Sequence, residues 1–196
     1  MRNLVLLSIF LISISGYAQK EVLSPEIQIK TAVLAAPSDK RAGAMVYGYD
    51  SSGNLKVLRE GSNNLVCIAD NPEEDGIKVA CYSKKLEPFM ARGRALIAEG
   101  KSEMEKRDIR AKEAKSGKLK MPDAPSTLYI YSGTEENYDN NTGELKDGKF
   151  RYVVYIPYAT AESTGLPLKP EAPGMPWLMD PGTHRAHIMI SPVSNN

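Results

Sequence analysis

Short runs of apolar residues, separated by polar turn-forming residues, dominate the first half of the chain. Four such runs cover residues 45–49, 55–58, 65–69 and 77–82, and Gly, Asn, Asp and Ser are frequent between them. Runs of this length with turn residues at both ends are typical of β-strands. The pattern therefore predicts a meander of antiparallel strands.

The two cysteines lie in the third and fourth of these runs. A hairpin centred on Glu74 places Cys67 opposite Cys81. Side chains alternate along a strand, so Leu65 and Val79 share the face of both sulfur atoms. We predict a structural disulfide, which suits an oxidising compartment. Two reduced, buried thiols are the alternative, and the chain has no close Cys-x-x-Cys pair that would indicate a redox enzyme.

Helical patterns precede and follow this meander. Ser24 is suited to cap a short helix that begins at Pro25. Apolar residues recur at helical spacing after residue 83 and predict a helix over residues 88–99. Ser102 and Glu105 form a capping-box pattern that opens a second, mostly charged helix. We interpret this charged stretch as a solvated helix, with a mobile flap as the alternative.

Three further runs are rich in β-branched and aromatic residues, at residues 127–131, 150–158 and 186–190. The second run is apolar on both faces, which indicates a central strand. Strands, helices and strands follow one another without regular βαβ alternation. We therefore predict one α+β domain over residues 19–196, with a mainly antiparallel sheet of about six or seven strands. The 88–99 helix would pack on the sheet and the charged helix would lie outside.

Residues 1–18 have the pattern of a signal peptide. Arg2 precedes an apolar stretch at residues 4–14, and small residues at positions 16 and 18 suit a cleavage site. The apolar stretch is too short for a membrane anchor. We therefore expect a periplasmic or secreted protein that begins near Gln19 and has no membrane anchor after cleavage.

The charge balance gives no indication of a nucleic-acid partner. The full sequence has 25 basic and 24 acidic residues, and the signal pattern contains one charged residue, Arg2. The remaining chain is neutral and has no dominant basic segment. We expect neither nucleic-acid nor anionic-membrane binding.

Residues 167–191 hold the candidate site. This segment contains the only Trp, both His and five prolines before its last apolar run, at positions 167, 170, 173, 176 and 181. Proline has no N–H for backbone pairing, so we expect an irregular segment that packs against the sheet. The predicted ligand-binding residues are Tyr155, Tyr158, Trp177, Asp180 and His184. The alternative is that these side chains are core residues under the segment.

A divalent transition metal is a further hypothesis for the same segment. His184, His187 and Asp180 carry the ligand types that zinc, iron or copper prefer. The alternative is that one histidine caps a turn and the other packs beside Met189. From their positions we expect His184 in a turn that meets solvent and His187 in a buried strand. One histidine could also act as a general base for a hydroxyl nucleophile. Calcium-loop and phosphate-loop motifs are absent.

Two classes of function follow from these patterns. The first is a non-catalytic protein that binds a small molecule or a partner chain through residues 167–191. The second is a metal-assisted or histidine-dependent hydrolase.

Four stretches of the sequence resemble those of uncharacterised exported bacterial proteins. They are VCIAD at residues 66–70, ACY at 80–82, LEPFMARGR at 86–94 and PWLMDPGT at 176–183. The resemblance covers most of the chain after the signal. It implies a bacterial envelope or secreted location and carries no assigned activity.

Overall fold

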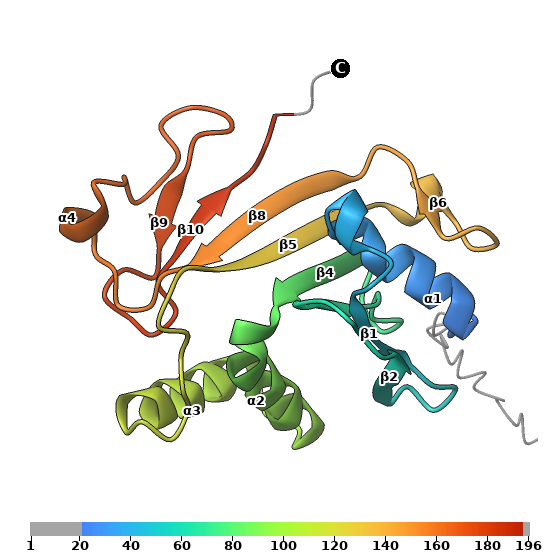
Figure 1. Ribbon diagram of the computed structural model, residues 1–196, viewed down its shortest axis with the longest axis horizontal. Coiled ribbons are helices and arrows are strands. Elements are labelled where there is room, and N and C mark those ends of the chain that lie inside the picture. The colour runs from blue at the N-terminus through green and yellow to red at the C-terminus, as the bar shows by residue number, and fades with distance from the viewer. Residues whose placement is uncertain (1–20, 194–196) are drawn as a thin grey trace, which may run out of the picture.

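Eight strands form one mixed sheet in the order β2-β1-β3-β4-β5-β8-β10-β9 (Figure 1). The computed structural model describes residues 21–193, so the predicted signal lies outside the described residues. The strands are β1 Met45–Tyr49, β2 Leu55–Arg59, β3 Leu65–Ile68, β4 Ile77–Ser83, β5 Ser126–Gly133, β8 Lys149–Tyr155, β9 Trp177–Met179 and β10 His187–Ile190. A separate two-stranded ribbon comprises β6 Tyr138–Asp139 and β7 Glu144–Leu145.

Four α-helices and four short 3-10 helices accompany the sheet within the described residues. The α-helices are α1 Pro25–Ala32, α2 Glu87–Ala98, α3 Glu103–Lys115 and α4 Ala161–Thr164. The 3-10 helices are η1 Val33–Ala35, η2 Ser38–Lys40, η3 Lys84–Leu86 and η4 Glu135–Asn137. Among residues 21–193, no helix has the length and apolar character needed to cross a membrane.

The predicted α+β class with a mainly antiparallel sheet is confirmed, but two details were wrong. The sheet has eight strands rather than six or seven, and β1 and β3 are parallel neighbours. The hairpin strand β2 returns along the outer edge of β1. The next strand, β3, then runs in the direction of β1 and pairs with its inner edge, which makes this one pair parallel.

The strand β9 is the eighth strand and was not expected from the sequence. It lies between Pro176 and Pro181 in the segment for which we predicted irregular backbone. Its three residues pair antiparallel with β10, and Leu178 is opposite Ile188. Proline is tolerated next to a short edge strand because only the residues between the prolines need to donate hydrogen bonds. The prolines therefore limit the length of β9 without preventing it.

Two hydrophobic clusters cover the two faces of the sheet. Because side chains alternate, Cys67 and Cys81 face α1 and η1, whereas Val66 and Tyr82 face α2. The first cluster also contains Ala32, Val33, Ala35, Ala36, Ala44, Val46, Leu65, Ala69 and Val79. The second also contains Leu86, Phe89, Leu119, Leu128, Val153, Tyr155 and Met189. The sheet therefore lies between α1 on one face and α2 on the other (Figure 1).

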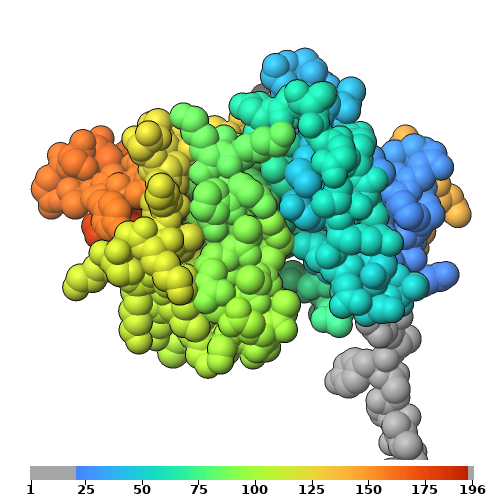
Figure 2. All heavy atoms as spheres, turned by 60° about the horizontal axis from the view of Figure 1, so that its bottom comes forward, coloured from blue at the N-terminus to red at the C-terminus, as the bar shows by residue number. Residues whose placement is uncertain are grey.

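The helices α2 and α3 lie side by side over the second face (Figure 2). The predicted capping box of α3 is present: Glu105 N donates to Ser102 Oγ, and Ser102 N donates to Glu105 Oε2. Arg92 of α2 binds Glu113 of α3 through two nitrogens. The charged helix is therefore ordered, and it also buries Arg110, which the interpretation as a solvated helix did not anticipate.

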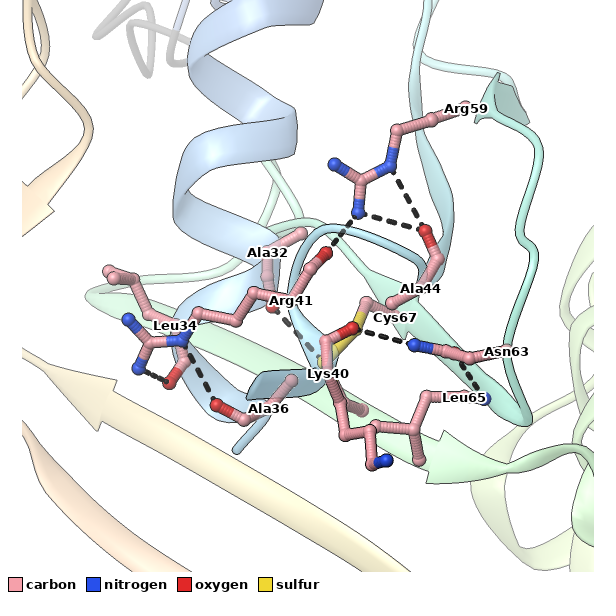
Figure 3. The surroundings of a disulfide bond; sticks show 11 residues. Ala32, Leu34, Ala36, Lys40, Arg41, Ala44, Arg59, Asn63, Leu65 and Cys67 are labelled. Atoms are coloured by element: carbon pink, nitrogen blue, oxygen red, sulfur yellow. Dashed lines mark hydrogen bonds between the residues drawn. A yellow bond between two sulfur atoms is a disulfide. The ribbon is translucent and has the colours of Figure 1, made fainter. Parts of the chain in front are cut away.

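The predicted disulfide between Cys67 and Cys81 is confirmed. The two residues are directly opposite in the β3–β4 hairpin, and their Cα atoms are 4.0 Å apart. Figure 3 shows the residues around the bridge. Arg59 donates to the carbonyl oxygens of Ala44 and Arg41 nearby. The bridge joins β3 to β4 covalently on the face of the sheet that α1 and η1 cover.

Candidate functional site

Tyr155 and His187 are neighbours in the sheet and supply one wall of the candidate site. They occupy opposite positions of the β8–β10 pair, their ring centroids are 5.3 Å apart, and both are buried. His187 Nδ1 donates to Arg185 O at 2.7 Å, which fixes the proton on that nitrogen. The sequence prediction that His187 is a buried strand residue is confirmed.

The turn before β10 carries His184 into the protein. Its backbone is tied to the segment after β8, because Tyr158 N donates to Thr183 O and Gly182 N donates to Ala159 O, both at 2.8 Å. Tyr158 and Asp180 adopt positive φ angles of 66° and 52°. These two left-handed residues let both segments turn sharply toward each other.

His184 is buried, so the expectation that it meets solvent was wrong. Its exposed fraction is 7%, and its ring is 6.0 Å from the ring of Phe89 in an edge-to-face arrangement. The turn residues Pro181, Gly182 and Thr183 are exposed as predicted, but the chain then folds back over α2. Sequence spacing shows that a turn is present and does not show which element lies beneath it.

Arg110 approaches the same Phe89 ring from α3. Its guanidinium carbon lies 4.1 Å from the ring centroid, its Nη1 donates to Phe89 O at 3.4 Å, and its exposed fraction is 8%. The described residues form several Arg–carboxylate ion pairs, and Arg110 takes part in none of them. A buried arginine is normally paired, so this side chain is unusual.

Arg110 and His184 also share a hydrogen-bonding property. Among residues 21–193, the buried side-chain nitrogen and oxygen atoms without a hydrogen-bond partner are Arg110 Nε and His184 Nε2. Since both side chains pack against Phe89, the two unpartnered nitrogens belong to one region. We name this region the Arg–His cluster. It comprises Phe89, Arg110, Tyr155, His184, Arg185 and His187.

The charges around the cluster are mainly positive. Burial lowers the pKa of His184, and the charges of Arg185 and Arg110 lower it further. Burial also lowers the pKa of Arg110, again assisted by Arg185. The carboxylate of Asp180 opposes this field, but it already binds Arg185 at 3.1 Å. Both histidines are therefore neutral near pH 7, and two guanidinium groups face a single engaged carboxylate.

The structure divides the sequence-predicted ligand residues into two groups. Tyr155 and His184 lie in the interior, while Tyr158 is exposed at the surface. Trp177 is half-buried in β9 and packs against the second hydrophobic cluster, and Asp180 lies at the rim of the turn.

Three residues of the Arg–His cluster, Phe89, Arg110 and Arg185, were missed as site residues. Arg110 lies in a stretch dominated by charge, where a single inward-facing arginine has no sequence signal of its own. A glycine inside α2, at position 93, is the one feature that hints at a large neighbour there.

The metal hypothesis gains no geometric support from the structure. Within residues 21–193, no three His, Cys, Asp or Glu side chains come together in a way that could hold a metal ion. His184, His187 and Asp180 therefore do not form such a group. Asp180 points its carboxylate to Arg185, and His187 uses Nδ1 for a backbone oxygen.

A cavity of about 460 Å³ lies elsewhere, beside α1 and away from the Arg–His cluster. Residues of α1, of the turn after β3 and of the β6–β7 ribbon line it. Burial, together with the carboxylates of Glu74, Asp70 and Glu73, raises the pKa of Tyr49 in its wall to about 12.

The polar groups of this cavity are already bound to other protein groups. Gln28 accepts from Tyr49 N and donates to Tyr49 O. The hydroxyl groups of Thr31 and Tyr138 are 2.6 Å apart. The carboxylates of Asp70 and Glu135 accept from backbone N–H groups. The cavity offers space but no unsatisfied buried group, in contrast to the Arg–His cluster.

Comparison with protein-family models, curated proteins and solved structures found no match to this chain.

Proposed function

We propose that this protein is a non-catalytic, exported binding protein whose ligand site is the Arg–His cluster beside residues 167–191. One observation carries the proposal: Arg110 Nε and His184 Nε2 are buried without a hydrogen-bond partner. An unsatisfied buried polar group costs about 1–3 kcal/mol, so two in one region are a stability cost without structural benefit. A bound ligand that hydrogen bonds to them removes this cost.

The surface next to the cluster supports a binding role. Large apolar side chains of the proline-rich segment are exposed, among them Leu168, Met175 and Met179, and Tyr158 is exposed nearby. Apolar side chains gathered on one exposed segment are typical of interaction sites. A ligand or partner chain that inserts a polar group into the cluster could cover these side chains with its apolar part.

An oxidising location agrees with the structure. The Cys67–Cys81 bridge is buried at the centre of the sheet, and such bridges persist in the periplasm and outside the cell. This observation and the signal pattern at residues 1–18 together support a periplasmic or secreted protein.

A histidine-dependent hydrolase is the second candidate. The observation that favours it is the fixed tautomer of His187: the Nδ1 proton is donated to Arg185 O, which leaves Nε2 as a neutral base. The ring beside it belongs to Tyr155, whose pKa is raised by burial. A buried phenol with a raised pKa is a poor nucleophile, so binding is the better-supported function.

A melting screen separates the two candidates. The wild-type protein is heated with a panel of uncharged sugars, amines and organic acids, and ester hydrolysis is followed in parallel. We expect at least one compound to raise the melting temperature of the wild type and to have little effect on His184→Phe. Ester hydrolysis that scales with protein concentration and disappears in His187→Gln would instead establish the hydrolase.

A further inference from the structure

We propose that the Arg–His cluster binds an oxyanion group, either a carboxylate or a phosphate, through Arg110 and His184. This inference rests on the proposed binding function and names the chemical class of the ligand. It concerns the polar group that enters the cluster and makes no statement about the rest of the ligand.

The two unpartnered nitrogen atoms, Arg110 Nε and His184 Nε2, can be satisfied by a hydrogen-bond acceptor. A guanidinium group carries five N–H donors and no acceptor, so Arg110 Nε can only be satisfied by an oxygen or another acceptor. Nη1 of the same group already donates to Phe89 O. The Nε2 atom of His184 becomes a second donor when its proton is placed there. A planar or tetrahedral oxyanion has acceptor oxygens for both nitrogens, whereas a protonated amine or a metal ion has none.

The charge balance of the site also favours an anionic ligand over a cation. Arg110 and Arg185 are the cations of the cluster, the charge of Arg107 also acts on Arg110, and Asp180 is engaged by Arg185. Glu103 also acts on Arg110, but it is paired with Lys106 on the same helix. An additional anion therefore finds one buried guanidinium that no carboxylate of the described residues neutralises. A cation would meet the opposite field and gain nothing.

The packing holds the donors in place for such a ligand. Arg110 stacks over the Phe89 ring, and His184 contacts the edge of the same ring. Both side chains have little freedom to reorient because each is more than nine-tenths buried. A donor pair that is ordered before binding loses little conformational entropy when the ligand arrives.

Both donors are buried, Arg110 on α3 and His184 in the turn before β10. The exposed turn residues Pro181, Gly182 and Thr183 directly precede His184, so the imidazole lies next to a solvent-facing part of the chain.

The test uses inorganic phosphate and sodium acetate as probes, with ionic strength held constant by sodium chloride. Thermal melting and isothermal calorimetry are carried out on the wild type, Arg110→Met, His184→Phe and Arg107→Met. Arg110→Met keeps the length of the side chain and removes its donors, and His184→Phe keeps a ring against Phe89. Arg107→Met is the matched control, because Arg107 is an exposed arginine on the same helix.

We expect phosphate, acetate or both to raise the melting temperature of the wild type. Arg107→Met removes a charge that acts on Arg110 but neither proposed donor, so it should keep most of this rise. Affinity should fall by about tenfold or more in Arg110→Met and His184→Phe, which is the usual contribution of a hydrogen bond to a charged group. The probe that binds identifies the group. If Arg110→Met fails to fold, Arg110→Lys, which keeps the charge and loses Nε, should show the same weakening.

Two outcomes contradict the inference and are distinguishable. If neither anion binds but an uncharged compound of the screen does, and its binding depends on Arg110 or His184, the proposed function stands and the oxyanion assignment is wrong. If the anions bind all four proteins equally, or if no compound binds the wild type, both the assignment and the proposed site are wrong.

Discussion

Gly93 of α2 lies directly against Arg110 of α3: a Cβ atom at position 93 would be 3.0 Å from Arg110 Nη1. Glycine inside a helix costs about 1 kcal/mol relative to alanine. This destabilising glycine occurs at a position where the methyl group of alanine would be in very close contact with the guanidinium of Arg110. The glycine therefore keeps room for an arginine that stacks on Phe89 and forms no ion pair with a carboxylate among residues 21–193.

We predict that Gly93→Ala and Arg110→Ala are energetically coupled. In the Arg110→Ala background, Gly93→Ala should raise the free energy of unfolding by about 0.5–1 kcal/mol through helix propensity. In the wild-type background this gain should be smaller or reversed, because the new methyl group displaces the guanidinium. Urea unfolding of the four proteins measures the difference. An equal effect of Gly93→Ala in both backgrounds would show that the two residues do not constrain each other.

Both histidines should contribute to stability. His184→Ala and His187→Ala should each lower the free energy of unfolding by about 1–3 kcal/mol, because each leaves a hole beside an aromatic ring. Leu168→Ala is the control, since Leu168 is exposed in the same part of the chain. Its unfolding curve should nearly match that of the wild type. A wild-type-like midpoint for His184→Ala would mean that His184 is more exposed in solution than the structure shows.

Stability should fall when the protein is acidified from neutral pH. Burial lowers the pKa of both His184 and His187 below the ordinary value of 6.5. The unfolded chain therefore binds protons at a higher pH than the folded chain. The contribution of the two neutral histidines to the free energy of unfolding is fully present above about pH 6.5. It decreases as the pH falls toward their lowered pKa values in the folded protein.

The groups that act on these histidines define the control for the pH experiment. Arg185 and Arg110 disfavour protonation of His184, and Asp180 favours it. For His187, Asp180 and the Arg185 backbone oxygen favour protonation. Unfolding is measured between about pH 7.5 and 5.5 in the wild type and in the His184→Gln/His187→Gln double variant. A slope that is unchanged in the double variant would assign the pH dependence to other groups.

The disulfide should contribute a large part of the stability. The bridge closes a loop with a sequence separation of 14, and loops of this length correspond to about 3 kcal/mol in the chain-entropy model. Cys67→Ala/Cys81→Ala should unfold at lower urea concentration by that amount. Thiol titration of the denatured, unreduced wild type should detect no free thiol. Two free thiols, or no change of midpoint after reduction, would contradict this role.

The fold was predictable where local pattern decides it. The register of Cys67 opposite Cys81 followed from the position of one turn, and the capping box at Ser102 marked the start of α3. The parallel β1–β3 pair was not predictable, because it depends on which edge of β1 the later strand joins. The strand β9 was not predicted because closely spaced prolines disfavour regular pairing, although a three-residue edge strand fits between two of them.

The candidate site was predictable only in part. Tyr155 was predicted because aromatic residues beside a proline-rich segment can line a ligand pocket, and His184 and His187 because they are the two histidines of the sequence. Arg110 was missed because its role comes from packing against Phe89 across two helices. Hydropathy favours Met104 over Arg110 as an inward-facing residue of α3, yet Met104 is exposed and Arg110 is buried. Tertiary packing overrides residue type here.

The hydrogen bonds of Thr31 have a consequence for how the chain is made. Thr31 in α1 bonds to Tyr138 and Gly143, which follow it by 107 and 112 residues. The second hydrophobic cluster likewise includes Met189, near the end of the chain. A ribosome releases these partners long after α1 has emerged, so neither face of the sheet can be completed during early synthesis. The newly made N-terminal half therefore keeps apolar surface exposed until translation has nearly finished.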